Sequence, residues 1–352
     1  MLIRFKKSFT QQEPLPENAI SKAIEVMRSG RLHRYNVVAE ETPEVSLLER
    51  EFADWQGVKY CLATASGGQA LQIALRAAGV KSGDLVLANA YTLAPVPGAI
   101  FAVGAQPVLV EVNAKWHTDI EDLRSKAETS GARFLMLSHM RGHIANMDVI
   151  DNICEEFNIK MIEDCAHTMG ARWKGRRSGN FGDIACFSTQ TYKHINSGEG
   201  GFLTTNNPIF AARAIVTSGS YMIYNTHGAA PDEEVFQRVK LNNPNCSARM
   251  DNLRAAILRP QLNNLEDNIK RWNELYKTLE TELRKAPKID FSERAQHEDY
   301  VGSSIQFHVK SNEIDSIPLF IERCQKRGVE LKWFGREEPI GFTSRYDSWK
   351  YL

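Results

Sequence analysis

One lysine stands where a sheet would present it to a ligand. Lys193 follows the apolar run Ile184–Phe187 and a polar run that opens with Ser188, and the glycine-rich segment Gly198–Gly201 comes soon after it. An amine beyond the end of a buried strand can capture a carbonyl group when burial or a nearby cation lowers its pKa. The sequence therefore makes Lys193 a candidate nucleophile.

Other apolar runs also end in groups that could bind a ligand. In an open parallel sheet, ligands bind beyond the carboxyl ends of the strands, so these groups are expected to meet. Together they offer a glycine turn suited to phosphate, aromatic and imidazole groups, an acid, an arginine and the lysine. The segments are Ser66–Gln69, Asn89–Thr92, Ser138–Arg141, Glu163–His167 and Ser188–Lys193.

This set of groups predicts a cofactor with a phosphate, a ring and a basic nitrogen. Pyridoxal phosphate has these features, and it needs a lysine for its aldehyde and a carboxylate beside its pyridinium nitrogen. Asp164, just after the apolar run Lys160–Ile162, is the best candidate for that carboxylate. Alone, the lysine is typical of a solvated surface residue, Asp164 of a helix cap and Ser66–Gly68 of a tight turn. The prediction depends on their occurring together.

Short apolar runs alternate with helical patterns along the chain. Runs that are apolar on both faces and separated by helices favour an α/β fold, with a mostly parallel central sheet and helices on both faces. The expected strands are Tyr60–Thr64, Leu85–Ala88, Gln106–Val110, Phe134–Leu137, Lys160–Ile162 and Ile184–Phe187. The expected helices run from Pro16 to a stop at Gly30, from Val45 to Trp55 and from Ala70 to Ala78.

The chain is long enough for a second, smaller domain. We expect residues 1–240 to form a large cofactor-binding domain and residues 241–352 a small α+β domain. A long helix, Asp251–Lys285, would join them as a hinge. In the small domain we expect strands at Ser304–Val309 and Val329–Lys332 and a helix at Ile317–Arg327.

Composition excludes several classes of partner. Lys and Arg total 43, as do Asp and Glu, and no run of five like charges occurs, so nucleic acid is not expected as a partner. No apolar stretch is long enough for a secretion signal or a membrane span, and the six cysteines lack C-x-x-C spacing, which is typical of a reduced cytoplasmic protein. His139 and His143 lack the further ligands of a tetrahedral metal site, so no metal is expected.

Four motifs resemble those of the DegT/DnrJ/EryC1/StrS sugar aminotransferases. They occur in the family's order and spacing, within a similarity that runs from about Pro14 to about Leu265. This resemblance implies fold type I of the pyridoxal phosphate enzymes and a homodimer whose active sites lie at the subunit interface. The motifs are Ala65–Leu71, Ile162–Gly170, Phe187–Lys193 and Gly198–Gly201.

The resemblance also implies roles for particular residues. Lys193 would bind the cofactor aldehyde and move protons, Asp164 would contact the ring nitrogen, and His167 would lie near the ring hydroxyl. Ser188 and the turn at Gly67, Gly68 and Gln69 would bind the phosphate, because a helix start favours an anion. In the segment 245–251, Asn245 or Ser247 would reach the phosphate of the neighbouring subunit.

Three departures from the family pattern leave contacts open. Leu93 stands where members usually place an aromatic residue over the cofactor ring, so either Tyr91 substitutes or an aliphatic side chain packs there. Ser247 stands where an asparagine is expected, which leaves the contact across the dimer open. Arg141 replaces an aromatic or aliphatic residue and suits a phosphate or carboxylate on the substrate.

The activity expected from the resemblance is ping-pong transamination from glutamate or glutamine to a keto sugar. A 3-keto hexose 6-phosphate is the preferred acceptor, and it would need a cation such as Arg141 or Lys174. A nucleotide-linked keto sugar and an inosose remain alternatives, as do a sugar dehydratase and a non-catalytic homologue. Further substrate contacts are expected from His33, Tyr35 and Tyr221.

Overall fold

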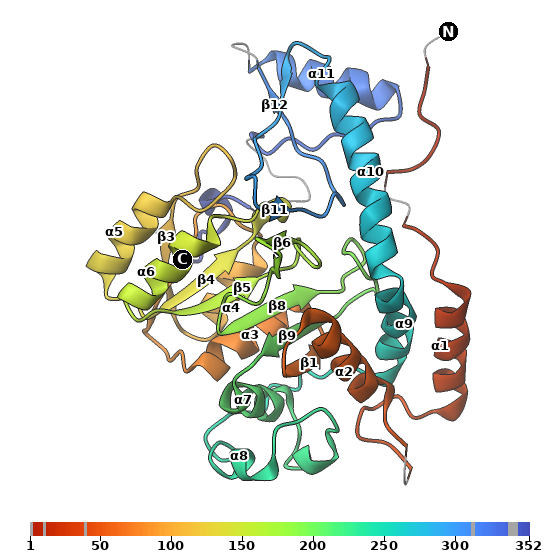
Figure 1. The fold of residues 1–352 in the computed structure, drawn as a ribbon, viewed down its shortest axis with the longest axis vertical. Coiled ribbons are helices and arrows are strands. Elements are labelled where there is room, and N and C mark those ends of the chain that lie inside the picture. Colours follow the sequence, from red (N-terminus) through yellow and green to blue (C-terminus); the bar gives the residue numbers. More distant parts are fainter. Residues whose placement is uncertain (1–2, 10–11, 39–40, 311–313, 337–343) are drawn as a thin grey trace.

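A seven-stranded sheet forms the centre of the computed structural model, which describes residues 3–9, 12–38, 41–310, 314–336 and 344–352 (Figure 1). Its strand order is β1 (Tyr60–Thr64), β9 (Gly201–Thr205), β8 (Ile184–Ser188), β5 (Lys160–Asp164), β4 (Phe134–Ser138), β2 (Leu85–Asn89) and β3 (Gln106–Val110). Only β9 runs antiparallel to its neighbours among these seven strands. The mostly parallel sheet and its expected strands are confirmed.

Helices cover both faces of the sheet, as expected (Figure 1). One face packs against α3 (Gly67–Ala78), α4 (Pro95–Ala102) and α7 (Pro208–Ser218), which is followed by α8 (Glu233–Gln237). The other face packs against α2 (Glu44–Gln56), α5 (Ile120–Ser130), α6 (Met147–Glu156) and α9 (Asn252–Asn263). The first helix, α1 (Glu17–Ser29), lies on α9 and ends at Gly30, whose φ of 67° is the left-handed value that glycine favours at a helix end.

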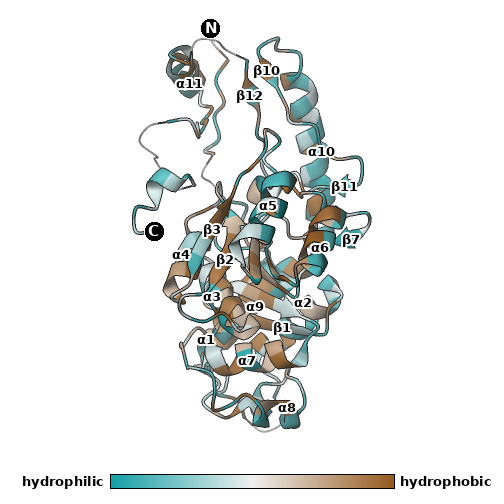
Figure 2. Ribbon diagram, turned by 90° about the vertical axis from the view of Figure 1, so that its left-hand side faces the viewer, coloured by the Kyte–Doolittle hydropathy of each residue, from teal (hydrophilic) through white to brown (hydrophobic). Residues whose placement is uncertain are grey.

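Alternation along the strands sends successive side chains to opposite faces. In β5, Met161 packs on the α2 and α6 side, whereas Ile162 packs on the α3 side. Figure 2 shows the resulting pattern, with hydrophobic strands and inner helix faces at the centre and hydrophilic residues outside. Because both faces are covered, the polar residues of the site gather where the strands end.

The C-terminal part begins with α10 (Leu265–Leu283), which extends past the sheet (Figure 1). Beyond it, β10 (Ile289–Asp290) pairs with β12 (His308–Val309), and α11 (Ser316–Lys326) follows. A second small sheet joins β11 (Glu298–Asp299) to β6 (Arg172–Trp173) and β7 (Arg176–Arg177). The short helices are η1 (Met140–Gly142), η2 (Tyr224–Thr226) and η3 (Tyr346–Ser348).

Three expectations for this part need correction. The long helix is two helices, because α9 ends at Asn263 and its C-cap, Asn264, separates it from α10. The strand expected at Ser304–Val309 is confined to its last two residues, and Val329–Lys332 lies outside any strand. A domain boundary at residue 240 stays a prediction, and the packing of α9 on α1 and α2 places residues 252–263 with the sheet.

Candidate active site

Three polar side chains end neighbouring parallel strands on the same face of the sheet. Ser138 ends β4, Asp164 ends β5 and Ser188 ends β8. Each lies two residues beyond a side chain that packs in the α3 core, so the period of two turns all three toward α3. The expectation that the groups after these strands meet at one edge is confirmed for this trio.

Asp164 is held by a short chain of hydrogen bonds. Its Oδ2 accepts from the Ser138 hydroxyl at 3.0 Å, and its Oδ1 accepts from the backbone N–H of Ala166 at 3.1 Å. The Ser138 oxygen in turn accepts from the Thr92 hydroxyl at 2.8 Å. A buried carboxylate with several hydrogen-bond donors is fixed in orientation. It can therefore face a cationic ring nitrogen without turning away.

Lys193 lies in the turn after β8, and its amine contacts another residue of the site. Nζ is 3.2 Å from Nε2 of His167. Burial lowers the pKa of Lys193 to about 8, an effect that the Asp164 carboxylate opposes and the Arg141 cation adds to. A substantial share of the amine is therefore neutral near pH 8, as a nucleophile requires.

His167 is the partner of that amine. Burial holds its pKa well below the usual range, and the cations Lys193 and Arg141 lower it further. The imidazole is therefore neutral at neutral pH, and it can accept a proton from the lysine in a hydrogen bond. The structure thus brings together Lys193, His167 and Asp164.

The start of α3 forms a close cradle with the ends of β8 and β9. Ser66 caps the helix by accepting the N–H of Gln69 at 3.1 Å. A Cβ added at Gly67 would lie 2.9 Å from that of Ser188, and one added at Gly201 would lie 2.7 Å from the nitrogen of Gly67. Gly68 has more room, since a Cβ there would lie 3.7 Å from Pro95.

This cradle suits an anion. Helix starts leave backbone N–H groups unpaired and carry a partial positive charge. Because the N–H of Gln69 donates to Ser66, we expect the phosphate contacts to come from Gly67 and Gly68 rather than from that N–H. The residues fit pyridoxal phosphate, since the cradle, the carboxylate and the amine are the three groups that the cofactor needs.

Tyr91 and Leu93 follow β2, and their relation to a cofactor ring stays open. The Tyr91 ring lies among aromatic side chains, with centroids 5.3 Å from Trp116 and 5.9 Å from Phe334. Burial raises its pKa to about 12. Leu93 is half-buried just before α4. The ring of Tyr91 thus packs against Phe334, in the C-terminal part of the chain.

Arg141 lies beside this aromatic group. Its backbone is left-handed, with a φ of 56°, and its guanidinium carbon is 5.0 Å from the centre of the Phe334 ring. Its charge also lowers the pKa of Lys193. Arg141 therefore connects the lysine site to the C-terminal part. Lys174, the other cation considered for the acceptor, is exposed and pairs with Asp148 at 2.7 Å.

The residues expected near the substrate at 33–35 have different surroundings. His33 is exposed, whereas Arg34 is buried and forms two hydrogen bonds to the Glu49 carboxylate at 2.8 and 2.9 Å. The Tyr35 hydroxyl lies 3.0 Å from Nδ1 of His227, and that ring is itself 3.2 Å from Glu49. This buried ion-pair network fixes the loop, so a substrate role stays a prediction for His33 and Tyr35.

Tyr221, Asn245 and Ser247 form a separate exposed group. The Arg249 guanidinium carbon lies 4.9 Å from the centre of the Tyr221 ring, and its Nη1 donates to the Gly219 carbonyl at 2.9 Å. Asn245 accepts the backbone N–H of Ser247 at 3.0 Å. Roles for these residues across a dimer or at a substrate stay predictions.

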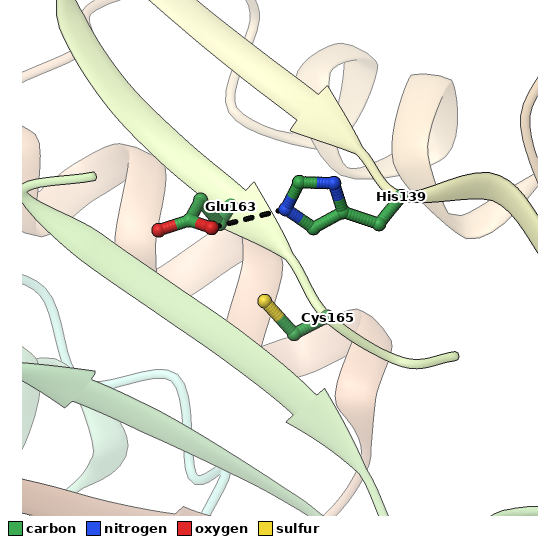
Figure 3. A group of neighbouring side chains, drawn as sticks. All are labelled: His139, Glu163 and Cys165. Atoms are coloured by element: carbon green, nitrogen blue, oxygen red, sulfur yellow. Dashed lines mark hydrogen bonds and ion pairs between the residues drawn. The ribbon is translucent and has the colours of Figure 1, made fainter. Parts of the chain in front are cut away.

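A buried group of possible metal ligands lies on the opposite face of the sheet ends. Figure 3 shows Glu163 facing the ring of His139, with Cys165 beside them. The Glu163 carboxylate accepts backbone N–H groups from residues 179, 181 and 182 and is 3.0 Å from Nε2 of His139. Burial raises the pKa of Cys165 well above its usual range, which disfavours the thiolate that a metal binds. The Glu163 carboxylate and the Cys165 thiol thus already have hydrogen-bond partners within the protein.

Two features of the site were not foreseen from sequence. The chain of hydroxyls through Thr92 and Ser138 to Asp164 depends on strand neighbours that are 26 and 46 residues apart. The ion pair of Arg34 and Glu49, with His227, spans up to 193 residues. The order of the strands would have indicated the chain of hydroxyls, whereas no local sequence pattern indicates the ion pair of Arg34 and Glu49.

Comparison with known proteins identifies similar chains. Residues 16–348 match the model of the DegT/DnrJ/EryC1/StrS aminotransferase family. The chain is 36% identical to dTDP-3-amino-3,6-dideoxy-alpha-D-galactopyranose transaminase of Aneurinibacillus thermoaerophilus over 236 residues. This match covers 66% of this chain and 61% of that protein. It is 32% identical over 286 residues to the erythromycin biosynthesis sensory transduction protein EryC1 of Saccharopolyspora erythraea, covering 81% and 70%.

The fold is also that of solved structures. S. venezuelae DesV, in complex with a ketimine intermediate, superposes with a TM-score of 0.75 at 27% identity, covering 89% of this chain and 78% of that one. The sequence matches to the first curated relatives span 61% and 60% of those proteins' own lengths. Within the described ranges, no helix has the length and apolar character needed to cross a membrane.

Proposed function

The chain belongs to the DegT/DnrJ/EryC1/StrS aminotransferase family, and we propose that it is a pyridoxal phosphate-dependent aminotransferase that moves an amino group from an amino acid to a keto sugar. The observation that carries the proposal is the meeting of Lys193, His167 and Asp164 beside the α3 cradle. A lysine of lowered pKa, a fixed carboxylate and an anion site are independent features, and the cofactor uses all three.

Pyridoxal phosphate, when bound, supplies a ring that accepts the electrons left on the amino acid's Cα after its proton is removed. Lys193 would provide the amine that holds the cofactor, and its Nζ would take the proton from the Cα of the donor. A pKa of about 8 suits both cofactor binding and proton transfer, because the amine can hold and release a proton near neutral pH. His167, neutral and 3.2 Å away, orients the amine.

Asp164 and the cradle hold the cofactor in place. The carboxylate, oriented by Ser138 and the N–H of Ala166, would keep the ring nitrogen protonated. Ser188 and the backbone at Gly67 and Gly68 would hold the phosphate. Since these groups lie on strand ends and a helix start, they would be in position to hold the ring before substrate binds.

The acceptor is proposed to be a keto sugar, with a 3-keto hexose 6-phosphate as the specific candidate. The names of similar proteins include a dTDP-sugar transaminase, a UDP-sugar aminotransferase and an inosose aminotransferase. Arg141 favours an anionic acceptor, because its cation lies close enough to Lys193 to lower the pKa of that amine. The donor is proposed to be glutamate or glutamine.

A homodimer with shared active sites is part of the proposal. On α1, Ile20, Ile24 and Met27 follow a helical spacing and are 38%, 36% and 53% exposed, an apolar stripe that a second copy would cover. A cytoplasmic location is also proposed. All six cysteines are free, as they are in a reducing compartment.

A two-step screen tests the function. The purified protein with pyridoxal phosphate is mixed with glutamate or glutamine, and the visible absorbance of the cofactor is followed. Loss of that absorbance with one donor, and its return on adding a keto sugar, is the expected result. A dehydratase or a non-catalytic homologue would show no such response to an amino donor, and that outcome would refute the proposal.

A further inference from the structure

The loop that carries Arg141 has an unfavourable backbone conformation. Arg141 and Gly142, in η1, have left-handed φ values of 56° and 83°. This region costs free energy for a residue with a Cβ, so the arginine keeps it only where its surroundings impose it. Because the Arg141 cation lowers the pKa of Lys193, the contacts that hold this loop bear on the electrostatics of the lysine site.

On its inner side, the loop packs against the turn that carries His167. A Cβ added at Gly142 would lie 3.2 Å from the backbone oxygen of His167, so the glycine lets the two segments approach closely. The N–H of His139, just before the loop, donates to the carbonyl of Asp164 at 3.1 Å. The loop is therefore in direct contact with the segment whose imidazole lies 3.2 Å from the amine of Lys193.

On its outer side, the loop is held by one ion pair from the C-terminal part of the chain. Nη1 of Arg294 donates to the Gly142 carbonyl at 3.3 Å. The N–H of Ile144 donates to Oε1 of Glu298 at 3.4 Å. The same two atoms of Arg294 and Glu298 lie 2.7 Å apart. A single ion pair thus binds a backbone carbonyl and a backbone N–H at the end of the loop.

This ion pair is itself buried and fixed by its neighbours. The Glu298 side chain is fully buried, and the Arg294 side chain is 14% exposed. The Arg294 guanidinium carbon lies 4.1 Å from the ring centre of Tyr300 and 5.6 Å from that of Tyr276, in α10. Glu298, in β11, pairs through its backbone with Trp173 of β6. A buried pair with fixed neighbours can hold the backbone that it contacts, whereas water loosens an exposed pair.

We propose that Arg294 and Glu298 are positioning residues for the lysine site, because their ion pair holds the backbone at Gly142 and thereby keeps the Arg141 cation close to Lys193. This role rests on the proposed function, which makes the Lys193 amine the reacting group. Burial, the Asp164 carboxylate and the Arg141 cation all act on the pKa of that amine. The ion pair acts through the third of these.

Competitive acetylation of the full chain without cofactor tests the proposal. A short pulse of acetic anhydride modifies neutral amines, so acetylation of the Lys193 peptide against pH, followed by mass spectrometry, gives the midpoint of that amine. The variant is Arg294→Met, which keeps an apolar stem beside the two tyrosines and removes the cation and its donors. Its midpoint should lie roughly 0.5 pH unit above that of wild type, the scale expected when one partly screened charge moves away.

A double variant separates this role from a merely structural one. In the Arg141→Gln background, adding Arg294→Met should raise the midpoint little further, because the cation that the pair positions is already absent. Arg294→Lys keeps a cation and a donor, so its midpoint should return toward that of wild type. A wild-type midpoint in Arg294→Met, or an equal rise with and without Arg141, would overturn the proposal.

Two further variants complete the test. If Arg294→Met fails to fold because Glu298 is left buried without its partner, Arg294→Met with Glu298→Gln removes the pair without leaving that charge, and the same rise is expected. The matched control is Arg284→Met, which removes another cation of the C-terminal part, 4.9 Å from the ring centre of Phe291, and should keep the wild-type midpoint. The labelling needs no cofactor, so it decides the role of the ion pair by itself. Failure of pyridoxal phosphate to bind wild type would instead refute the proposed function.

Discussion

Nζ of Lys193 lies 3.2 Å from Nε2 of His167, and the pKa of each group is lowered. Burial is the main cause for both, and the Lys193 cation lowers the pKa of His167 further. A neutral imidazole beside a partly neutral amine is an arrangement that keeps a nucleophile ready at neutral pH. It makes the electrostatics around Lys193 the first property to test.

The pH dependence of cofactor binding should follow the Lys193 amine. Only the neutral amine attacks an aldehyde, so the rate at which apoenzyme binds pyridoxal phosphate should rise with pH and reach half its maximum near pH 8. Arg141→Gln removes a cation that lowers this pKa, so its midpoint should move to higher pH. Stopped-flow absorbance measures the rates. A midpoint that stays in place or moves lower would show that Arg141 does not act on the amine.

Asp164→Asn should move the same midpoint the opposite way. The carboxylate raises the pKa of Lys193 by stabilising the ammonium form, so its loss should lower that pKa and shift the curve to lower pH. The donor half-reaction should also slow by roughly 10²–10³-fold, the usual loss when a preorganised charge is removed. Ser138→Ala, which keeps the carboxylate, is the matched control and should shift the curve less. A half-reaction at the wild-type rate would contradict the role of Asp164.

The buried pair of Arg34 and Glu49 should be important for stability. Both side chains are fully buried, so Arg34→Ala would leave the Glu49 carboxylate without its main partner and cost about 3–5 kcal/mol in the free energy of unfolding. Arg31→Ala removes a comparable but exposed pair with Glu41 and should cost about 1 kcal/mol or less. Unfolding in urea compares them. Similar losses for the two variants would show that burial of the pair is unimportant.

Gly201→Ala should damage the phosphate cradle. The added Cβ would lie 2.6 Å from the Phe187 carbonyl oxygen and 2.7 Å from the nitrogen of Gly67, and backbone atoms cannot easily move aside. We expect a loss of about 1–3 kcal/mol of stability and weaker binding of pyridoxal phosphate, measured by equilibrium titration. Gly68→Ala, with its nearest contact at 3.7 Å, should fold normally. Unchanged cofactor affinity in Gly201→Ala would mean that the cradle is not the phosphate site.

The sheet could be predicted from sequence because most of its strands are recognisable from their own residues. Runs such as Phe134–Leu137 and Ile184–Phe187 are apolar on both faces and separated by helical patterns, which the parallel arrangement requires. The edge where Ser138, Asp164 and Ser188 meet then followed from the direction of the strands. The antiparallel β9 was not among the expected strands, although the glycine-rich segment Gly198–Gly201 is typical of the entry to a strand.

The C-terminal part was less predictable because its structure depends on distant partners. The strand expected at Ser304–Val309 pairs only where β10 lies beside it, and Val329–Lys332 pairs with no strand in the described part of the chain. The break at Asn264 was overlooked because apolar residues continue through it at helical spacing. No local pattern indicates that Arg34 is buried, because its partners Glu49 and His227 lie 15 and 193 residues away. A pairing between residues so far apart has no local pattern.

The most direct test of the account is to locate the lysine that binds the cofactor. The protein with pyridoxal phosphate is reduced with borohydride, which fixes the cofactor to the amine that holds it, and the modified peptide is identified by mass spectrometry. We predict modification at Lys193 and its loss in Lys193→Ala. Modification at another lysine, with Lys193 unmodified, would contradict the central claim.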